Sequence, residues 1–189
     1  MAPLIFDQAG NLFGTTSIGG KYYGMGTVFE LSPPSNPGEP WIEAQIHDFH
    51  PATDGSLPEA GLTPGPGGVF FGTASVAGPH GRGTVFGLAP PSSPGEPWGF
   101  AVLHSFNNVS DGGSPGAGLT PGGPNTFYGT AGVVFQLVYS GGVWTETVLY
   151  NFDLGPGSNT GVILYKDGLY GTTSKGGYKN QGTVFRLSH

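Results

Sequence analysis

Aspartate and asparagine side chains on glycine-rich segments are the residues of this sequence best suited to bind a metal ion. Asp54 in TDGSLP and Asp111 in SDGGSP occupy equivalent places in two similar stretches, and a shorter third stretch, DLGPGSNT, supplies Asp153 and Asn159. Calcium accepts carboxylate and carbonyl oxygens at relaxed geometry. We therefore predict that Asp54, Asp111 and Asn159 are Ca²⁺ ligands. A structural role is the alternative, because Asp-Gly pairs also form ordinary tight turns.

His80 has no counterpart in the similar stretches. It lies beside Arg82 in AGPHGRG, and an unrepeated polar residue says more about function than a repeated one. The sequence has no Gly-x-Ser-x-Gly or His-Glu-x-x-His motif, so a hydrolase built on it must use metal-activated water or an acid–base pair. His80 and Asp153 are the candidate catalytic residues for that chemistry. A solvated loop histidine is the alternative to a general base.

Aromatic, cationic and amide side chains gather in two further glycine-rich segments, GGKYYGMG and GGYKNQG. Such side chains can stack on a sugar or grip an acyl chain, and a plain surface role is the alternative. Together with the arginine next to His80, these segments provide the candidate ligand-binding residues Tyr22, Tyr23, Arg82, Tyr178 and Asn180.

The sequence that positions these segments is repetitive. GNLFGTTSIGG, at residues 10–20, returns as GVFFGTASVAG at 68–78, as a shortened TFYGTAGVVF at 126–135 and as DGLYGTTSKGG at 167–177. Every copy leads into a second signature, GTVFEL, GTVFGL, GVVFQL or GTVFRL. The 37 glycines and 18 prolines recur between short apolar runs, a pattern typical of turns between many strands.

Each full unit is consistent with four short antiparallel strands, for example residues 60–63, 69–75, 83–89 and 98–106 of the second unit. Four such strands in about fifty residues are typical of one blade of a β-propeller, with a sandwich or a barrel as the alternative. We predict one all-β domain over residues 1–189, a small β-propeller of about four blades and about 15 strands. The units are expected at residues 2–58, 59–115, 116–160 and 161–189, the last without its outer strand, as in a piece of a longer array.

The third unit has shorter links than the others. It turns directly through Ala131 and Gly132, and its link to the fourth unit, DLGPGSNT, is also short. Both links belong to the propeller face that carries the candidate residues named above. We therefore expect a notch in that face at the third blade.

Composition excludes several classes of function. Only 10% of the residues are charged, the net charge is −6, and the few lysines and arginines form no basic run, so we expect no nucleic-acid partner. No apolar stretch is long enough to span a membrane, and the start MAPLIFDQAG has no signal-peptide pattern. Cysteine is absent, which excludes disulfides and leaves the compartment undecided.

The motifs GNLFGTTSIGG, GTVFELSP, IHDF and DG resemble the GloVer tandem repeat of bacterial, mostly secreted, proteins. That resemblance implies a propeller and an extracellular setting. At the level of repeat order, the sequence is also similar to the NHL and gluconolactonase (regucalcin-like) propellers. The second resemblance implies a divalent cation, usually calcium, that activates water against a lactone.

Two functions follow as hypotheses. The first is a hydrolase of lactones or related esters that uses loop-bound Ca²⁺, and the alternative is a non-catalytic module that binds a glycan or a protein. The last strand, GTVFRLS at residues 182–188, has no following strand to pair with. An unpaired strand edge is normally covered. We expect it to pair with a second copy in a homodimer, or with the N-terminal segment MAPLIF.

Overall fold

The computed structural model describes residues 2–22, 24–93, 95–107, 110–152 and 160–188, which fold into 15 strands in four antiparallel sheets. The first sheet holds β1 (Ile5–Phe6), β2 (Leu12–Thr16), β3 (Thr27–Ser32) and β4 (Ile42–Asp48). The second holds β5 (Thr63–Pro64), β6 (Phe70–Ala74), β7 (Thr84–Ala89) and β8 (Gly99–Ser105). The third holds β9 (Thr120–Gly123), β10 (Thr126–Thr130), β11 (Val133–Ser140) and β12 (Val143–Asn151). The fourth holds β13 (Ile163–Tyr165), β14 (Gly168–Thr173) and β15 (Thr183–Ser188).

The strands of each sheet are hydrogen-bonded in chain order. We call these sheets blades 1 to 4, and each lies within one of the four predicted units. The prediction of an all-β, propeller-like set of small blades is confirmed. The inner strand of blade 2 was expected at residues 60–63. In the structure this strand, β5, starts at Thr63 and has only two residues. No helix in the described part of the chain is long and apolar enough to cross a membrane.

A glycine in the second strand of every blade lies beneath an aromatic ring of the third strand. A Cβ added to Gly72 would lie 2.3 Å from the ring of Phe86, and one added to Gly129 would lie 2.4 Å from that of Phe135. Gly14 and Gly171 have the same relation to their blades. The repeated Phe-Gly-Thr and Val-Phe signatures are therefore two halves of one packing contact, in which the ring fits only over a residue without a side chain.

The cores lie between neighbouring blades. One cluster joins blade 1 to blade 2 through Phe13, Val28, Phe70 and Phe86, among others. Equivalent clusters join blade 2 to blade 3 and blade 3 to blade 4. Each blade thus buries its faces against its neighbours in the chain, as expected of a repeat architecture.

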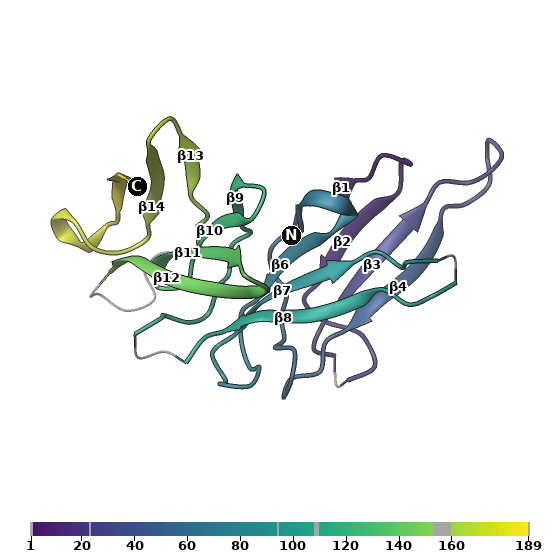
Figure 1. Ribbon diagram of the computed structural model, residues 1–189, viewed down its shortest axis with the longest axis horizontal. Coiled ribbons are helices and arrows are strands. Elements are labelled where there is room, and N and C mark those ends of the chain that lie inside the picture. Colours follow the sequence, from purple (N-terminus) through teal and green to yellow (C-terminus); the bar gives the residue numbers. More distant parts are fainter. Residues whose placement is uncertain (1, 23, 94, 108–109, 153–159, 189) are drawn as a thin grey trace.

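Blades 1 and 4 lie at opposite ends of the molecule (Figure 1). A ring closed within one chain would cover the outer face of blade 4, but Val184 on that face is 82% exposed. The four blades therefore form an open row. The N-terminal segment provides β1, which pairs with β2 as the inner strand of blade 1. It is thus used in blade 1, and the alternative in which MAPLIF covers β15 is wrong.

The glycine-under-ring contact predicts the effect of a single methyl group. Gly72→Ala should lower the free energy of unfolding by about 1–3 kcal/mol, because the added Cβ would overlap the fully buried ring of Phe86. Gly99→Ala is the matched control, since its Cβ would make only ordinary contacts, the nearest at 3.6 Å. Urea denaturation measures both. Equal stability of the two variants would contradict the packing role of Gly72.

Candidate functional site

The two predicted calcium-binding aspartates lie beside histidines of their own blades. His47 Nε2 is 3.2 Å from Asp54 Oδ2, and His104 Nε2 is 3.3 Å from Asp111 Oδ2. Asp54 Oδ2 also accepts the backbone N–H of His50 at 3.0 Å, while Asp54 Oδ1 accepts the Thr53 hydroxyl at 2.7 Å. Both oxygens of Asp54 are therefore used within the link that follows β4. The geometry agrees with the turn-forming alternative for this residue.

The described residues contain no ready group of metal ligands. Among the residues that the structure describes, no three histidine, aspartate or glutamate side chains are grouped so that they could hold a metal ion. Asp54 and Asp111 belong to different links, and Asp153 and Asn159 lie outside the described residues. Calcium binding by Asp54, Asp111 and Asn159 stays a prediction, as does a catalytic role for Asp153.

The two histidines are partly buried and pack against aromatic rings. Burial lowers the pKa of His47 and of His104, and the neighbouring aspartates oppose this only in part. The His47 ring stacks on Phe100 of blade 2 at 3.7 Å between centroids, with the rings nearly parallel. A neutral imidazole can still donate its Nε2–H to Asp54. The His47–Asp54 pair therefore connects β4, which packs against blade 2, to the link between blades 1 and 2.

Glu146 takes the place of Phe100 at the next interface. Phe100 pairs with Leu88 across blade 2, and Glu146 pairs with the equivalent Leu137 across blade 3. Burial, and then the charge of Asp111, raise the pKa of Glu146 to about 7. Its Oε1 atom is buried and has no hydrogen-bond partner in the described structure. This partly buried carboxyl group is the most perturbed titratable group of the described residues.

His80 and Arg82 lie in the exposed link between β6 and β7. His80 Nδ1 is 3.1 Å from the backbone oxygen of Ser105, and the His80 backbone N–H donates to the Ser105 hydroxyl at 3.3 Å. The backbone oxygen of Arg82 accepts the N–H of Ser114. These contacts hold the link against the end of β8 and against the link to blade 3. A general-base role for His80 and ligand binding by Arg82 stay predictions.

The predicted ligand-binding aromatic residues are far apart. Tyr22 packs edge-on against His50 and lines a hollow of about 510 Å³ in blade 1, together with His47, Asp48 and Asp54. Tyr178 is exposed in blade 4, where the Asn180 side chain accepts the N–H of Gly176. Tyr23 lies outside the described residues. Blades 1 and 4 are at opposite ends of the row, so these residues form no shared site within one chain (Figure 1).

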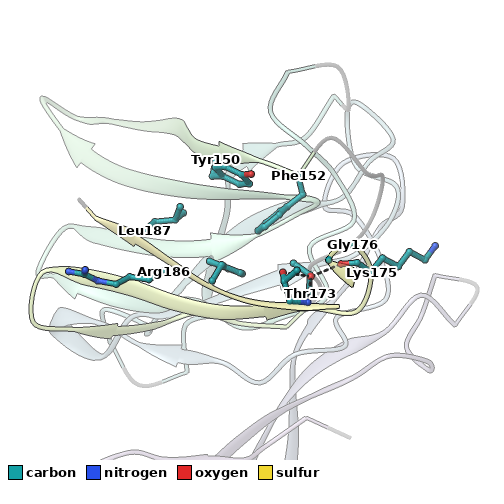
Figure 2. A pocket seen from close by; sticks show the side chains of 10 residues that line it. Tyr150, Phe152, Thr173, Lys175, Gly176, Arg186 and Leu187 are labelled. Carbon is teal, nitrogen blue, oxygen red and sulfur yellow. Dashed lines mark hydrogen bonds between the residues drawn. The ribbon is translucent and has the colours of Figure 1, made fainter. Parts of the chain in front are cut away.

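A cavity of about 480 Å³ opens between β12 of blade 3 and β15 of blade 4. Figure 2 shows Tyr150, Phe152 and Leu187 around it, with Lys175 at one end. The Arg186 side chain points away from the cavity and pairs with Asp167 at 3.1 Å. The Phe152 ring lies 5.0 Å from that of Tyr150 and 5.1 Å from that of Phe185, so one wall is aromatic. The cavity therefore has a largely apolar and aromatic lining.

The floor of this cavity is held by a threonine network. Thr173 and Thr183 share a hydrogen bond of 2.8 Å between their hydroxyl oxygens, and Thr173 Oγ1 also accepts the N–H of Thr183. The Thr173 hydroxyl is 2.6 Å from the backbone oxygen of Lys175. These bonds tie β14 to β15 beneath the opening, so the cavity is part of the sheet structure.

The repeat explains why this cavity exists. Tyr150 is the counterpart of His47 and His104, since all three pair with the buried valine of the third strand. In blade 2 the outer strand places Phe100 over His47. Blade 4 ends at β15 within the described chain, so no outer strand of that blade covers Tyr150. The cavity occupies the place of a side chain from a fourth strand.

Comparison with known proteins identifies the family. The family model of the Gloeobacter/Verrucomicrobia repeat matches residues 1–131, more than half of the chain. The chain belongs to the Gloeobacter/Verrucomicrobia repeat family. Searches of curated proteins and of solved structures gave no significant match. The resemblance to GloVer repeats is therefore confirmed, while the relation to NHL and gluconolactonase propellers stays a prediction.

Two features of this repeat protein were missed at the sequence level. The His–Asp pairs were not predicted, although the spacing of seven residues from His47 to Asp54 recurs from His104 to Asp111. The cavity was also missed. Its signal is the replacement of these histidines by Tyr150, which lines the cavity.

The raised pKa of Glu146 predicts a specific pH dependence of stability. The pKa is about 7 in the folded chain and near 4.5 when unfolded, so the protonated carboxyl favours folding. Its stabilising contribution is complete below about pH 4.5 and is lost as the pH rises through 7. At pH 8, Glu146→Gln should therefore be more stable than the native protein by about 1 kcal/mol, a figure reduced because the group is only partly buried.

Urea denaturation at pH 5 and pH 8 measures this difference. Glu96→Gln is the control, because Glu96 is exposed in the link between β7 and β8 of blade 2. The gain at pH 8 should be absent from the control. A Glu146→Gln variant with the native pH profile would show that this carboxyl is not desolvated.

Proposed function

We propose that the chain is a non-catalytic, protein-binding propeller module that accepts an extended segment of a partner protein along β15. The observation that carries this proposal is the cavity of about 480 Å³ beside the outer edge of that strand. The partner segment would form the fourth strand of blade 4, as β4, β8 and β12 do in the other blades. Its chemistry is that of a short β-strand with a large apolar side chain directed into the cavity.

The edge of β15 supplies the main-chain part of this interaction. In the described structure β15 is the last strand of its sheet, whereas the equivalent β3, β7 and β11 each pair with an outer strand. Such an edge offers alternating N–H and C=O groups to an extended chain. Addition of a strand to a sheet edge uses these groups for affinity and side-chain pockets for specificity.

The cavity supplies the side-chain part. A residue opposite Leu187 would correspond to Phe100, which lies opposite Leu88 in blade 2. It would enter the space beside Tyr150 and Phe152. Burial of one large apolar side chain contributes roughly 1.5–3 kcal/mol.

A peptide with the sequence of residues 98–106, WGFAVLHSF, is a suitable probe because it is the outer strand of blade 2. It should bind the native protein measurably, and Leu187→Asp should weaken binding at least tenfold by placing a charge in the apolar lining. Ser188→Asp is the control, since Ser188 is exposed on the other side of the strand. Fluorescence anisotropy of the labelled peptide measures all three.

A second peptide tests whether the cavity sets the specificity. The same sequence with Phe100→Asp should bind at least tenfold more weakly than the unmodified peptide. If both peptides bind the native protein equally, or if Leu187→Asp binds as well as the native protein, the proposed site is wrong.

Calcium distinguishes this proposal from the lactone hydrolase. A binding module of this kind needs no metal, so titration with CaCl₂ should produce no binding heat and no change in melting temperature. A saturable heat that is lost in Asp111→Asn would instead support the hydrolase with Ca²⁺ on the links between blades.

A further inference from the structure

Every blade has two different faces, and the internal interfaces show how they fit. The forward face, directed to the next blade, carries Phe13 and Val28 in blade 1 and the equivalent residues in blades 2 and 3. The reverse face, directed to the preceding blade, carries Leu62 and Phe70 in blade 2 and their equivalents in blades 3 and 4. Three times within the chain, a forward face is covered by a reverse face.

One forward face and one reverse face remain uncovered. Val28, Val85 and Val134 are fully buried on forward faces, but the equivalent Val184 of blade 4 is 82% exposed. On reverse faces Leu62, Leu119 and Val162 are buried, but the equivalent Leu4 of blade 1 is 48% exposed. The two open faces lie at opposite ends of the row (Figure 1). Each open face is therefore of the kind that covers the other kind at the internal interfaces.

The two end blades also carry opposite charge. Residues 161–189 hold four lysines and arginines against one aspartate, a net charge of +3. Residues 2–58 hold six aspartates and glutamates against one lysine, a net charge of −5. Arg186 lies on the same side of β15 as the exposed Val184, where it also pairs with Asp167 at 3.1 Å. In blade 1, Glu43 of β4 lies opposite Leu31 of β3. Contact between these blades would bring unlike charges together.

We infer that two copies of this chain associate head to tail, with the forward face of blade 4 of each copy packed against the reverse face of blade 1 of the other. This contact repeats the geometry of the three internal interfaces. Two rows of four blades close into a ring of eight, a number that propellers adopt. The same heterologous contact made twice satisfies both open faces of both copies.

Single charged substitutions on either face test this contact. Sedimentation velocity should give the native protein a mass of twice 19.4 kDa at micromolar concentration, with a weaker dimer in high salt. Val184→Asp and Leu4→Asp should each be monomeric, with the dissociation constant raised at least tenfold. Val143→Asp is the control, because Val143 is also an exposed valine, at the start of β12 in blade 3, and its substitution should leave the dimer intact.

Mixing the two variants distinguishes this contact from symmetric pairing of β15 with β15. Val184→Asp keeps an intact blade 1, and Leu4→Asp keeps an intact blade 4, so together they can form one native contact. Labelled Val184→Asp should therefore form a heterodimer with Leu4→Asp, although neither forms a homodimer. That result would also show that both variants are folded.

A native monomer would overturn the inference. So would a Leu4→Asp variant that still forms a homodimer, because dimerisation through residues 182–188 alone does not need blade 1. Absence of the heterodimer would also contradict the contact. These outcomes are independent of peptide binding at the cavity, whose test uses Leu187.

Discussion

The structure depends on the need of each small sheet to bury two apolar faces. A three- or four-stranded sheet cannot do this alone, and in this chain the neighbouring sheet supplies the cover. The same positions recur at every interface, so the repeated letters of the sequence are the repeated contacts of the core. Phe13, Phe71 and Tyr128 all pack in the same direction, toward the following blade. The end blades of the described row therefore each have one apolar face that no other blade of the described chain covers.

Function in such a molecule lies where the repeat is interrupted. The His–Asp pairs of the first two links are repeated. They connect the outer strands β4 and β8 to the links that follow them. By contrast, Glu146 lies where blade 2 has Phe100, and Tyr150 lies where blade 2 has His104. Both changes lie on β12, the strand that borders the cavity. The third blade thus differs from the others in its interfaces as well as in its links.

Much of the fold could be predicted from the sequence because strand order, turn glycines and alternating apolar residues are local signals. The number of strands and their division into four blades follow from repeats such as GTVFEL and GTVFRL. The site could not be predicted as well. Asp54 was interpreted as either a ligand or a turn residue, and only coordinates show that its oxygens accept hydrogen bonds from His50 and Thr53. The cavity depends on two segments of different blades, a relation that no short motif contains.

The glycine beneath the aromatic ring has a consequence for how such an array changes during evolution. Gly72 and Phe86 belong to the same blade, as do Gly129 and Phe135. A unit that is duplicated as a whole carries both members of this contact to its new position. A third strand from outside the repeat would have to supply a phenylalanine at the same position, because a smaller residue over the glycine leaves a void. Growth by whole units is thus the route that preserves the core, and insertions are tolerated in the links between strands.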